Sequence, residues 1–390
     1  MDKPTELVHH PYLPPAGFAA PQVGVHKAST VIFPNVAAMR ARDWKHKSGY
    51  TYGLHGTPTT FTLEERIATL EGGTQCVLCP SGLAAIALVD LALLKAGDEV
   101  LIPDNAYGPG KELARQELAR YGIAHRFYDA LDGAGLAQAI GPATRLVWVE
   151  APGSVTMEFP DLRALLAACR ARGVTSALDN TWGAGIAFDG FEAGADIVMQ
   201  ALTKYPSGGG DVLMGSVVTR DEALHLQLKL AHMRLGLGVG ANDAEALLRS
   251  LPSLPLRYAA QDEAGRALAR WLQRRPEIAA VRHPALAGSP GHEHWAATCR
   301  AAAGLFSVLL DERYQTAQVD RFVDALRLFR IGYSWGGPTS LVVPYQLAGM
   351  RSLGTPLRGT LVRFSVGLEA VQDLTADLVQ ALQAMAAPRR

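Results

Sequence analysis

The chain has 390 residues, 48% of them apolar, so it can bury a sizeable core and falls outside the disordered class. Its 37 basic residues balance 37 acidic ones without a basic stripe, which argues against a nucleic-acid or membrane-surface partner. Because no apolar run reaches the about 18 residues of a membrane helix, and the start lacks signal-peptide features, we expect a cytoplasmic protein that acts on a small molecule.

Helices and strands alternate from about residue 62, after a proline-rich segment without a sustained period. Ser81 is the expected N-cap of one helix, and Gly72 and Gly97 are expected to end the first two helices. The predicted helices cover 62–72, 82–97, 108–122 and 161–173. The predicted strands cover 99–103, 145–150, 174–179, 196–202 and 212–219.

This alternation predicts a mostly parallel sheet with helices on both faces. The pattern then changes: residues 242–276 are helical throughout, 305–311 and 359–369 are typical of strands, and 375–387 predicts a closing helix. We therefore predict an N-terminal arm over 1–45, an α/β domain over 46–240 and a smaller C-terminal α+β domain over 241–390.

Four cysteines in a chain of this length fit a reducing compartment. Cys76 and Cys79 form a C-x-x-C motif, but they lie in an apolar, strand-like run, whereas a redox pair needs a helix N-terminus beside it. We predict two buried thiols and, since no second pair completes a zinc site, no metal.

Lys204 follows the apolar run 196–202, where burying an ammonium is unfavourable unless its charge is paired or removed. In open α/β sheets, ligands bind beyond the carboxyl ends of the strands. The polar residues at such ends are Ser81-Gly82, Tyr107, Glu150, Asp179 and Lys204. One interpretation is a buried Asp179–Lys204 ion pair, and the other is a cofactor between the two.

Pyridoxal 5'-phosphate needs a lysine amine for its aldehyde and a carboxylate for its ring nitrogen. Its phosphate needs N–H donors, which the glycine turn after Ser81 offers where a helix begins. Tyr107 is the candidate to stack on the ring. Because all of these residues fall at strand ends, we favour the cofactor over the ion pair.

Eight stretches resemble, in the same order, the Cys/Met-metabolism family of pyridoxal-phosphate enzymes. They are "YTYGLHGTPTTFTLEERIATLEGG", "PSGLAAIAL", "DNAYGPG", "LDNTWGAG", "QALTKYPSGGGD", "HPALAGSPGHEHW", "YSWGGPTSL" and "GTLVRFSVGLE". The resemblance implies an aspartate-aminotransferase-like α/β fold (PLP fold type I). It also implies a homo-oligomer, a tetramer with active sites shared across subunits.

The resemblance assigns roles residue by residue. Lys204 should bond to the cofactor aldehyde and take the α-proton, aided by Tyr107 stacked on the ring, while Asp179 should partner the ring nitrogen. The phosphate contacts implied are the backbone of Gly82 and Leu83, the Thr203 hydroxyl, and Tyr52 of a neighbouring subunit. The substrate contacts implied are Arg363, for the α-carboxylate, with Ser334 and Trp335.

Four positions depart from the family pattern: Gly209 and Gly210 stand where the family usually has a His and a Ser, and two more concern the phosphate. Ala201 stands where many members have a serine that binds the phosphate, and Leu54 stands where many have an arginine. His55 is the nearest side chain that could replace the missing charge, provided that it is protonated.

Trp335 after Ser334 implies the β-lyase branch, since γ-specific relatives commonly have a smaller residue there. The expected reaction is cleavage of the amino-acid substrate L-cystathionine to homocysteine, pyruvate and ammonia, with cysteine and cystine as side substrates. A γ-lyase or γ-synthase is one alternative, and a cofactor-binding regulator without efficient turnover is another.

Overall fold

The computed structural model describes residues 2–9, 12–13, 15–353 and 359–386 and contains two β-sheets. The larger sheet has the order β1-β7-β6-β5-β4-β2-β3, and its neighbours are parallel except that β7 runs antiparallel to β1 and β6. The predicted mostly parallel sheet is confirmed. Its strands are β1 (Gln75–Cys79), β2 (Glu99–Pro103), β3 (Ala124–Tyr128), β4 (Thr144–Glu150), β5 (Thr175–Asp179), β6 (Ile197–Gln200) and β7 (Gly215–Thr219).

Helices cover both faces of this sheet, as β1 illustrates. Its alternate residues Cys76 and Leu78 pack into one core with α3, while Val77 and Cys79 pack into a second core with α4. Burial raises the pKa of both thiols, so the predicted buried cysteines are confirmed. The helices of this part are α3 (Pro58–Glu71), α4 (Gly82–Leu93), α5 (Gly108–Leu113) with a π-helical turn over Ala114–Leu118, α6 (Gly133–Ala139), α7 (Leu162–Ala171), α8 (Gly190–Ala193) and α9 (Glu222–Leu235).

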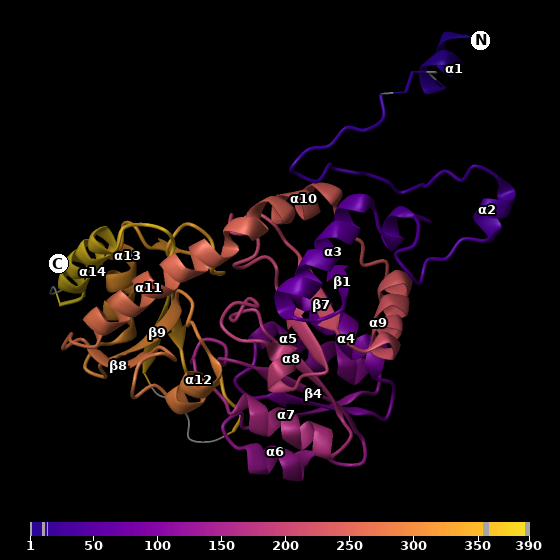
Figure 1. Ribbon diagram of the computed structural model, residues 1–390. Coiled ribbons are helices and arrows are strands. Elements are labelled where there is room, and N and C mark those ends of the chain that lie inside the picture. Colours follow the sequence, from indigo (N-terminus) through magenta and orange to yellow (C-terminus); the bar gives the residue numbers. More distant parts are fainter. Residues whose placement is uncertain (1, 10–11, 14, 354–358, 387–390) are drawn as a thin grey trace.

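The smaller sheet has the order β10-β11-β12-β9-β8 and packs with the C-terminal helices around a core that includes Phe306, Phe322 and Phe364. Helix α10 and the long helix α11 lead from the larger sheet to this one (Figure 1). The elements are α10 (Ala241–Ser250), a 3-10 turn (Leu251–Ser253), α11 (Leu254–Leu272), β8 (Ile278–Arg282), α12 (His292–Thr298), β9 (Leu305–Leu310), α13 (Thr316–Ala325), β10 (Arg330–Ile331), β11 (Leu341–Gln346), β12 (Thr360–Ser365) and α14 (Val371–Ala386).

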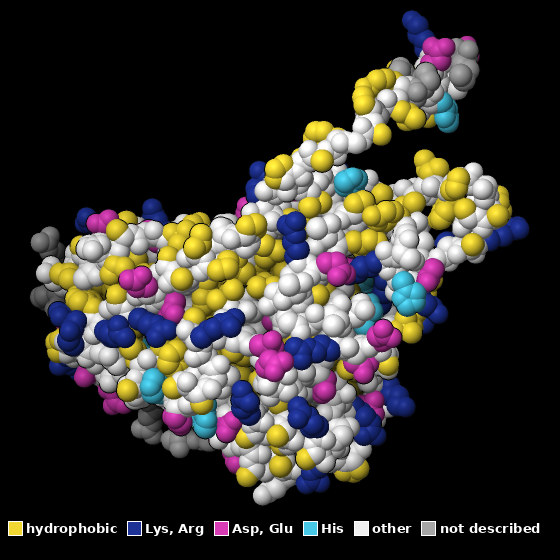
Figure 2. Space-filling view, viewed as in Figure 1, with side chains coloured by type: hydrophobic (Ala, Val, Ile, Leu, Met, Phe, Trp, Pro, Cys, Tyr) yellow, Lys and Arg dark blue, Asp and Glu magenta, His cyan; other side chains and the backbone are white. Residues whose placement is uncertain are grey.

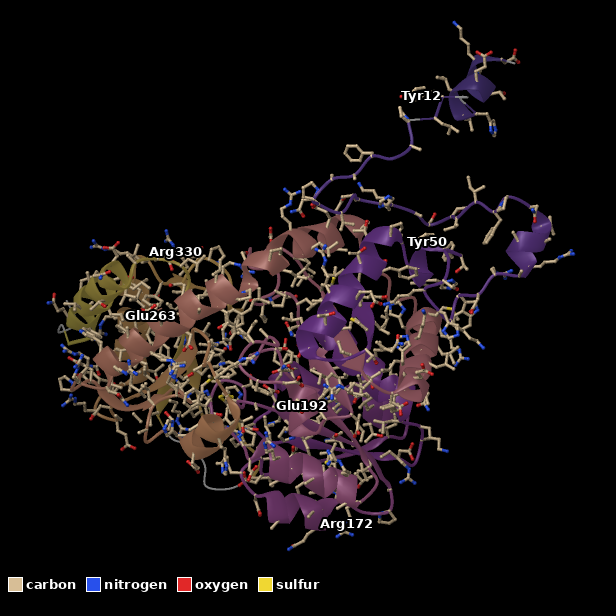
Figure 3. All side chains as sticks on the ribbon, viewed as in Figure 1. Tyr12, Tyr50, Arg172, Glu192, Glu263 and Arg330 are labelled. Atoms are coloured by element: carbon tan, nitrogen blue, oxygen red, sulfur yellow. The ribbon has the colours of Figure 1, made fainter. Side chains whose placement is uncertain are left out.

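The N-terminal segment extends away from both sheets (Figure 1) and contains only the short helices α1 (Lys3–Val8) and α2 (Val36–Arg40) among its described residues, before the 3-10 turn Gly53–His55. Hydrophobic side chains stand along it (Figure 2), with Phe18 91% and Ile32 90% exposed. Tyr12 lies far from the body, and Tyr50 lies where the segment approaches α3 (Figure 3). No helix in the described ranges combines the length and apolarity needed to cross a membrane.

Several predicted boundaries differ from those of the structure, and the predicted end of the second helix was wrong. Helix α4 ends at Leu93 rather than at Gly97, because the chain turns at Lys95, whose N–H donates to the Asp98 carboxylate at 2.9 Å. Gly97 occupies that turn with φ +90. The closing helix was predicted to reach residue 387, which lies outside the described residues.

The segment that contains Gly336 ties the smaller sheet to the loop after β6. Gly336 has φ +82, and a Cβ atom there would lie 2.7 Å from the backbone N of Tyr205. Tyr205 is fully buried, and its hydroxyl accepts a hydrogen bond from the Gly304 N–H at 2.9 Å. The loop that carries Lys204 is therefore clamped between the two parts of the chain.

We expect Gly336→Ala to lower the free energy of unfolding by about 2–4 kcal/mol, because it combines left-handed strain with a backbone clash. Gly97→Ala is the matched control, since Gly97 also has positive φ but open space around its Cβ position, and it should lower that free energy by only about 1 kcal/mol. Thermal unfolding measures both, and equal losses would contradict the assigned close contact.

Candidate active site

Two carboxylates end neighbouring parallel strands of the larger sheet. Glu150 of β4 and Asp179 of β5 are register partners, so their side chains emerge at the same sheet edge. The chain after β6 then delivers Lys204 to this edge. The predicted meeting of these residues beyond the carboxyl ends of the strands is thus what the topology produces.

Lys204 is half-buried, and its ammonium nitrogen lies 2.9 Å from the Ser334 hydroxyl and 5.5 Å from the centre of the Trp335 ring. Ser334 adopts φ 94, a strained conformation for a residue with a Cβ. Burial and the positive charge of Arg363 lower the pKa of Lys204 to about 8, and Asp179 opposes this shift. A sizeable fraction of the amine is therefore neutral and nucleophilic near neutral pH.

Asp179 does not form an ion pair with Lys204: no contact within 4.0 Å joins their charged atoms in the described structure. The Asp179 carboxylate instead accepts a hydrogen bond from the Thr181 N–H at 2.9 Å. Burial raises the pKa of Asp179, and the hydrogen bonds from Thr181 and the charge of Lys204 oppose this. A carboxylate and an amine that face one edge without touching leave room for a cationic ring between them.

Tyr107 begins α5, and its backbone N–H donates to the Glu150 carboxylate at 2.7 Å. Its side chain is 42% exposed, so one face of the ring is available for stacking. Burial, Asp179 and Glu150 all raise the pKa of the phenol, which stays protonated at neutral pH. Tyr107 is thus suited to stacking and hydrogen bonding rather than to accepting a proton.

The N-terminus of α4 provides the expected anion-binding backbone. The Ser81 hydroxyl accepts from the Ala84 N–H at 3.0 Å, and the first N–H groups of the helix, at Gly82 and Leu83, have no intrahelical partner. A Cβ atom at Gly82 would lie 2.6 Å from the Cβ of Ala201, so glycine allows the helix end to approach this loop closely.

The Thr203 hydroxyl is already used by the backbone of Met214, donating to its carbonyl at 3.2 Å and accepting from its N–H at 3.1 Å. To donate to a phosphate, this hydroxyl would have to turn away from the Met214 carbonyl.

Arg363 on β12 is 8% exposed, and no carboxylate lies within 4.0 Å of its guanidinium in the described part of the chain. Its guanidinium lies 5.3 Å from the centre of the Tyr345 ring. The phenols of Tyr333 and Tyr107 also lie close enough to raise its pKa against the lowering effect of burial. A buried guanidinium without a carboxylate partner is suited to bind a substrate carboxylate through two parallel bonds.

Tyr52 is not brought together with these residues. It is 46% exposed, and its ring packs at 5.9 Å against His55. Leu54 packs against the loop at Gly238 and lines a hollow that apolar residues of α9 and β1 share with Lys229, His225 and Glu64.

His55 could replace the missing charge only if it were protonated. Burial and the positive charges of Lys229 and Arg42 lower its pKa, and its ring nitrogen is 2.8 Å from the Thr51 hydroxyl. Within the described chain, both effects act against the charged form of His55.

Three further residues at this edge were missed by the sequence interpretation: Tyr333, Tyr345 and Thr181. Tyr345 lies on β11, whose partner strand β12 carries Arg363. Thr181 bonds Asp179 through its N–H and accepts the Ala201 N–H at 2.9 Å through its hydroxyl. Thr181 and Tyr333 had a signal, since each lies in a quoted motif, two residues after Asp179 and directly before Ser334 respectively.

The residues fit pyridoxal phosphate. The edge combines an amine of lowered pKa, an unpaired carboxylate, an aromatic ring and a glycine cradle at a helix N-terminus. In the described ranges no group of three or more His, Cys, Asp or Glu side chains is arranged to hold a metal ion.

Comparisons with known proteins agree with this class of site. The family model for Cys/Met metabolism PLP-dependent enzymes matches residues 4–383. The putative cystathionine beta-lyase of Rhizobium johnstonii is 40% identical over 374 residues, which is 95% of this chain and 93% of that protein. The cystathionine beta-lyase of Escherichia coli K12 is 37% identical over 361 residues, or 91% of each chain.

Among solved structures, cystathionine gamma synthase from Xanthomonas oryzae, crystallised with aminoacrylate and cysteine, matches with a TM-score of 0.86 and 31% identity over 95% of each chain. The fold is thus that of PLP fold type I enzymes, as predicted. The chain belongs to the Cys/Met metabolism family of PLP-dependent enzymes. It is a lyase that uses pyridoxal 5'-phosphate.

The lowered pKa of Lys204 predicts how cofactor-free protein captures pyridoxal phosphate. Only a neutral amine attacks an aldehyde, so the rate should rise with pH and reach half its maximum near about 8 rather than near 10.5. Because Arg363 disfavours the ammonium, Arg363→Met should move this midpoint upward. Absorbance of the bound cofactor measures the rate.

Arg330→Met is the control for this measurement, since Arg330 is an exposed arginine at the surface of the smaller domain (Figure 3). It should leave the midpoint in place. A midpoint that does not respond to Arg363→Met would contradict the assigned electrostatic link.

Proposed function

We propose that this protein cleaves L-cystathionine at the β-carbon–sulfur bond, giving homocysteine, pyruvate and ammonia, with cysteine and cystine as side substrates. The observation that carries the proposal is a buried Arg363 without a carboxylate partner beside the Lys204–Ser334–Trp335 group. Several relatives at 35–40% identity bear the name cystathionine beta-lyase, which supports the choice of branch.

Each residue has a part that follows from its surroundings. Arg363 binds the substrate α-carboxylate, and this fixes the α-carbon near the Lys204 amine. The neutral amine of Lys204 would hold the cofactor through its aldehyde, and as a free amine it would be placed to take the α-proton. Ser334 accepts or donates a hydrogen bond at that amine and keeps it directed at the reacting carbon.

When bound, pyridoxal phosphate withdraws the electrons left on the α-carbon. Asp179, which accepts a hydrogen bond from the Thr181 N–H, would keep a proton on the ring nitrogen and so sustain this withdrawal. Tyr107, a neutral phenol, would stack on the ring. Gly82 and Leu83 would bind the phosphate through their backbone N–H groups, with Thr203 and a neighbouring subunit's Tyr52 as further donors.

We propose a cytoplasmic homotetramer with shared active sites and the three parts predicted over 1–45, 46–240 and 241–390. Apolar side chains exposed along the N-terminal segment favour contact with another copy of the chain. All four cysteines are free thiols, which suits a reducing compartment. γ-Cleavage or γ-synthesis, and cofactor binding without turnover, remain the alternatives that experiment must separate.

Product identification tests the reaction. With L-cystathionine we expect pyruvate as the keto acid, because β-cleavage leaves a three-carbon fragment, whereas γ-cleavage would give 2-oxobutyrate. Chromatography of the keto acids distinguishes the two. Lys204→Ala should abolish product formation, and absence of turnover in the wild-type protein would favour the regulator.

Asp179→Asn should fold normally and lower kcat by about 100-fold or more, because an amide does not keep the ring nitrogen protonated in a buried site. Asp324→Asn, at an exposed position on α13, is the control and should leave kcat unchanged. Steady-state kinetics measures both. A kcat for Asp179→Asn within a few-fold of wild type would mean that another group partners the ring.

A further inference from the structure

Glu71 is a carboxylate buried at the C-terminal end of α3, with 1% of its surface exposed. One of its oxygens accepts a hydrogen bond from the Asn180 amide at 2.8 Å, and the other accepts from the Gln200 amide. Both amide side chains are fully buried. Glu71 thus joins two side chains that come from different strand ends.

These two amides flank the active-site groups in the chain. Asn180 directly follows Asp179 at the end of β5, and Gln200 ends β6 just before the turn that carries Lys204. A second link between the same segments is the bond from the Ala201 N–H to the Thr181 hydroxyl. The distance between the carboxylate and the lysine therefore depends on how these two strand ends are held.

No basic side chain pairs with Glu71 in the described ranges. Arg220, which donates to the neighbouring Gly72 carbonyl at 2.8 Å, faces Asp189 and Glu192 instead. Burial, Asp189 and Asp179 raise the pKa of Glu71, and the two amides lower it, so that it lies at about 7. Only the amides stabilise the ionised form.

The amides have unused hydrogen-bonding capacity. The carbonyl oxygens of Asn180 and Gln200 are buried and have no hydrogen-bond partner among the described residues. Buried amides normally bond through both ends. Leaving two buried oxygens unpaired is unfavourable, and in return both N–H donors point at a single carboxylate.

We propose that Glu71 is a positioning residue. Its carboxylate accepts a hydrogen bond from each of the two amides and so holds the ends of β5 and β6 at the separation at which Asp179 and Lys204 can both contact the cofactor. This inference rests on the roles proposed above for Asp179 and Lys204. Because a protonated carboxyl loses one acceptor position, both hydrogen bonds to Glu71 are formed above about pH 7 and are weakened below it.

The test measures binding of pyridoxal phosphate to cofactor-free protein, by absorbance or quenching of tryptophan fluorescence. Glu71→Gln keeps the size of the side chain but removes the charge. Its dissociation constant should exceed that of wild type by about tenfold near pH 8.5, where Glu71 is ionised, since hydrogen bonds to a charged group are lost. Near pH 6 the two proteins should agree within about twofold, since wild-type Glu71 is then protonated.

The ratio of the two constants isolates Glu71, because Lys204 and Asp179 are present in both proteins. Glu65→Gln is the matched control: it lies on the same helix with its side chain 63% exposed, and its ratio to wild type should stay near 1 at both pH values. A purely structural role for Glu71 would give the same ratio at both pH values, and that result would overturn the proposal.

Gln200→Met provides a second variant if Glu71→Gln does not fold, since it removes one donor without altering α3. It should also weaken cofactor binding near pH 8.5, and unchanged binding would contradict the proposed role of Glu71.

If wild-type protein captures the cofactor on Lys204 but the ratio of dissociation constants for Glu71→Gln is the same at both pH values, only the role of Glu71 is refuted. Capture on another lysine would refute the proposed site as well.

Discussion

The structure depends on keeping a buried amine and a buried carboxylate close without letting them meet. An ion pair between Lys204 and Asp179 would be the simplest way to compensate two desolvated charges, yet none forms within 4.0 Å in the described structure. The amine is instead destabilised as a cation by burial and by Arg363, and the carboxylate is stabilised by the Thr181 N–H. Both groups are thereby left available to a ligand that can accept a nucleophile on one side and offer a cation on the other.

Maintaining that separation explains much of the surrounding packing. The Lys204 turn is held from the smaller domain by the contact of Gly336 with Tyr205 and by the Ser334 hydroxyl. It is also held from α11 by Arg257, whose guanidinium donates to the Tyr205 carbonyl at 2.8 Å. A side chain fixed from two domains loses little further entropy when it reacts, which is how a fold converts packing into chemical positioning.

Much of the site could be predicted from sequence because it follows from topology. Parallel strands place their carboxyl ends at one edge, so Glu150, Asp179 and Lys204 converge without any knowledge of side-chain geometry. Elements without an apolar period were missed. Strand β3 lies at the sheet edge with Arg126 exposed, and β11 contains Pro344, which is tolerated because the short β10 leaves that part of β11 unpaired on one side. The charge state of His55 also depends on neighbours distant in sequence, namely Lys229 and Arg42.

The phosphate site raises a further physical point. The groups proposed to bind the phosphate from one chain are backbone N–H groups at Gly82 and Leu83 and a threonine hydroxyl, all uncharged, and the helix end contributes only about half a positive charge. Leu54 is apolar, and burial and neighbouring charges lower the pKa of His55, so neither residue adds a cation near Tyr52. Tyr52 packs against His55, and in the assembly proposed above it would serve the cofactor of another copy. A dianion bound mainly by neutral donors is therefore a reason for such an enzyme to assemble, since a second subunit brings donors that the first cannot supply.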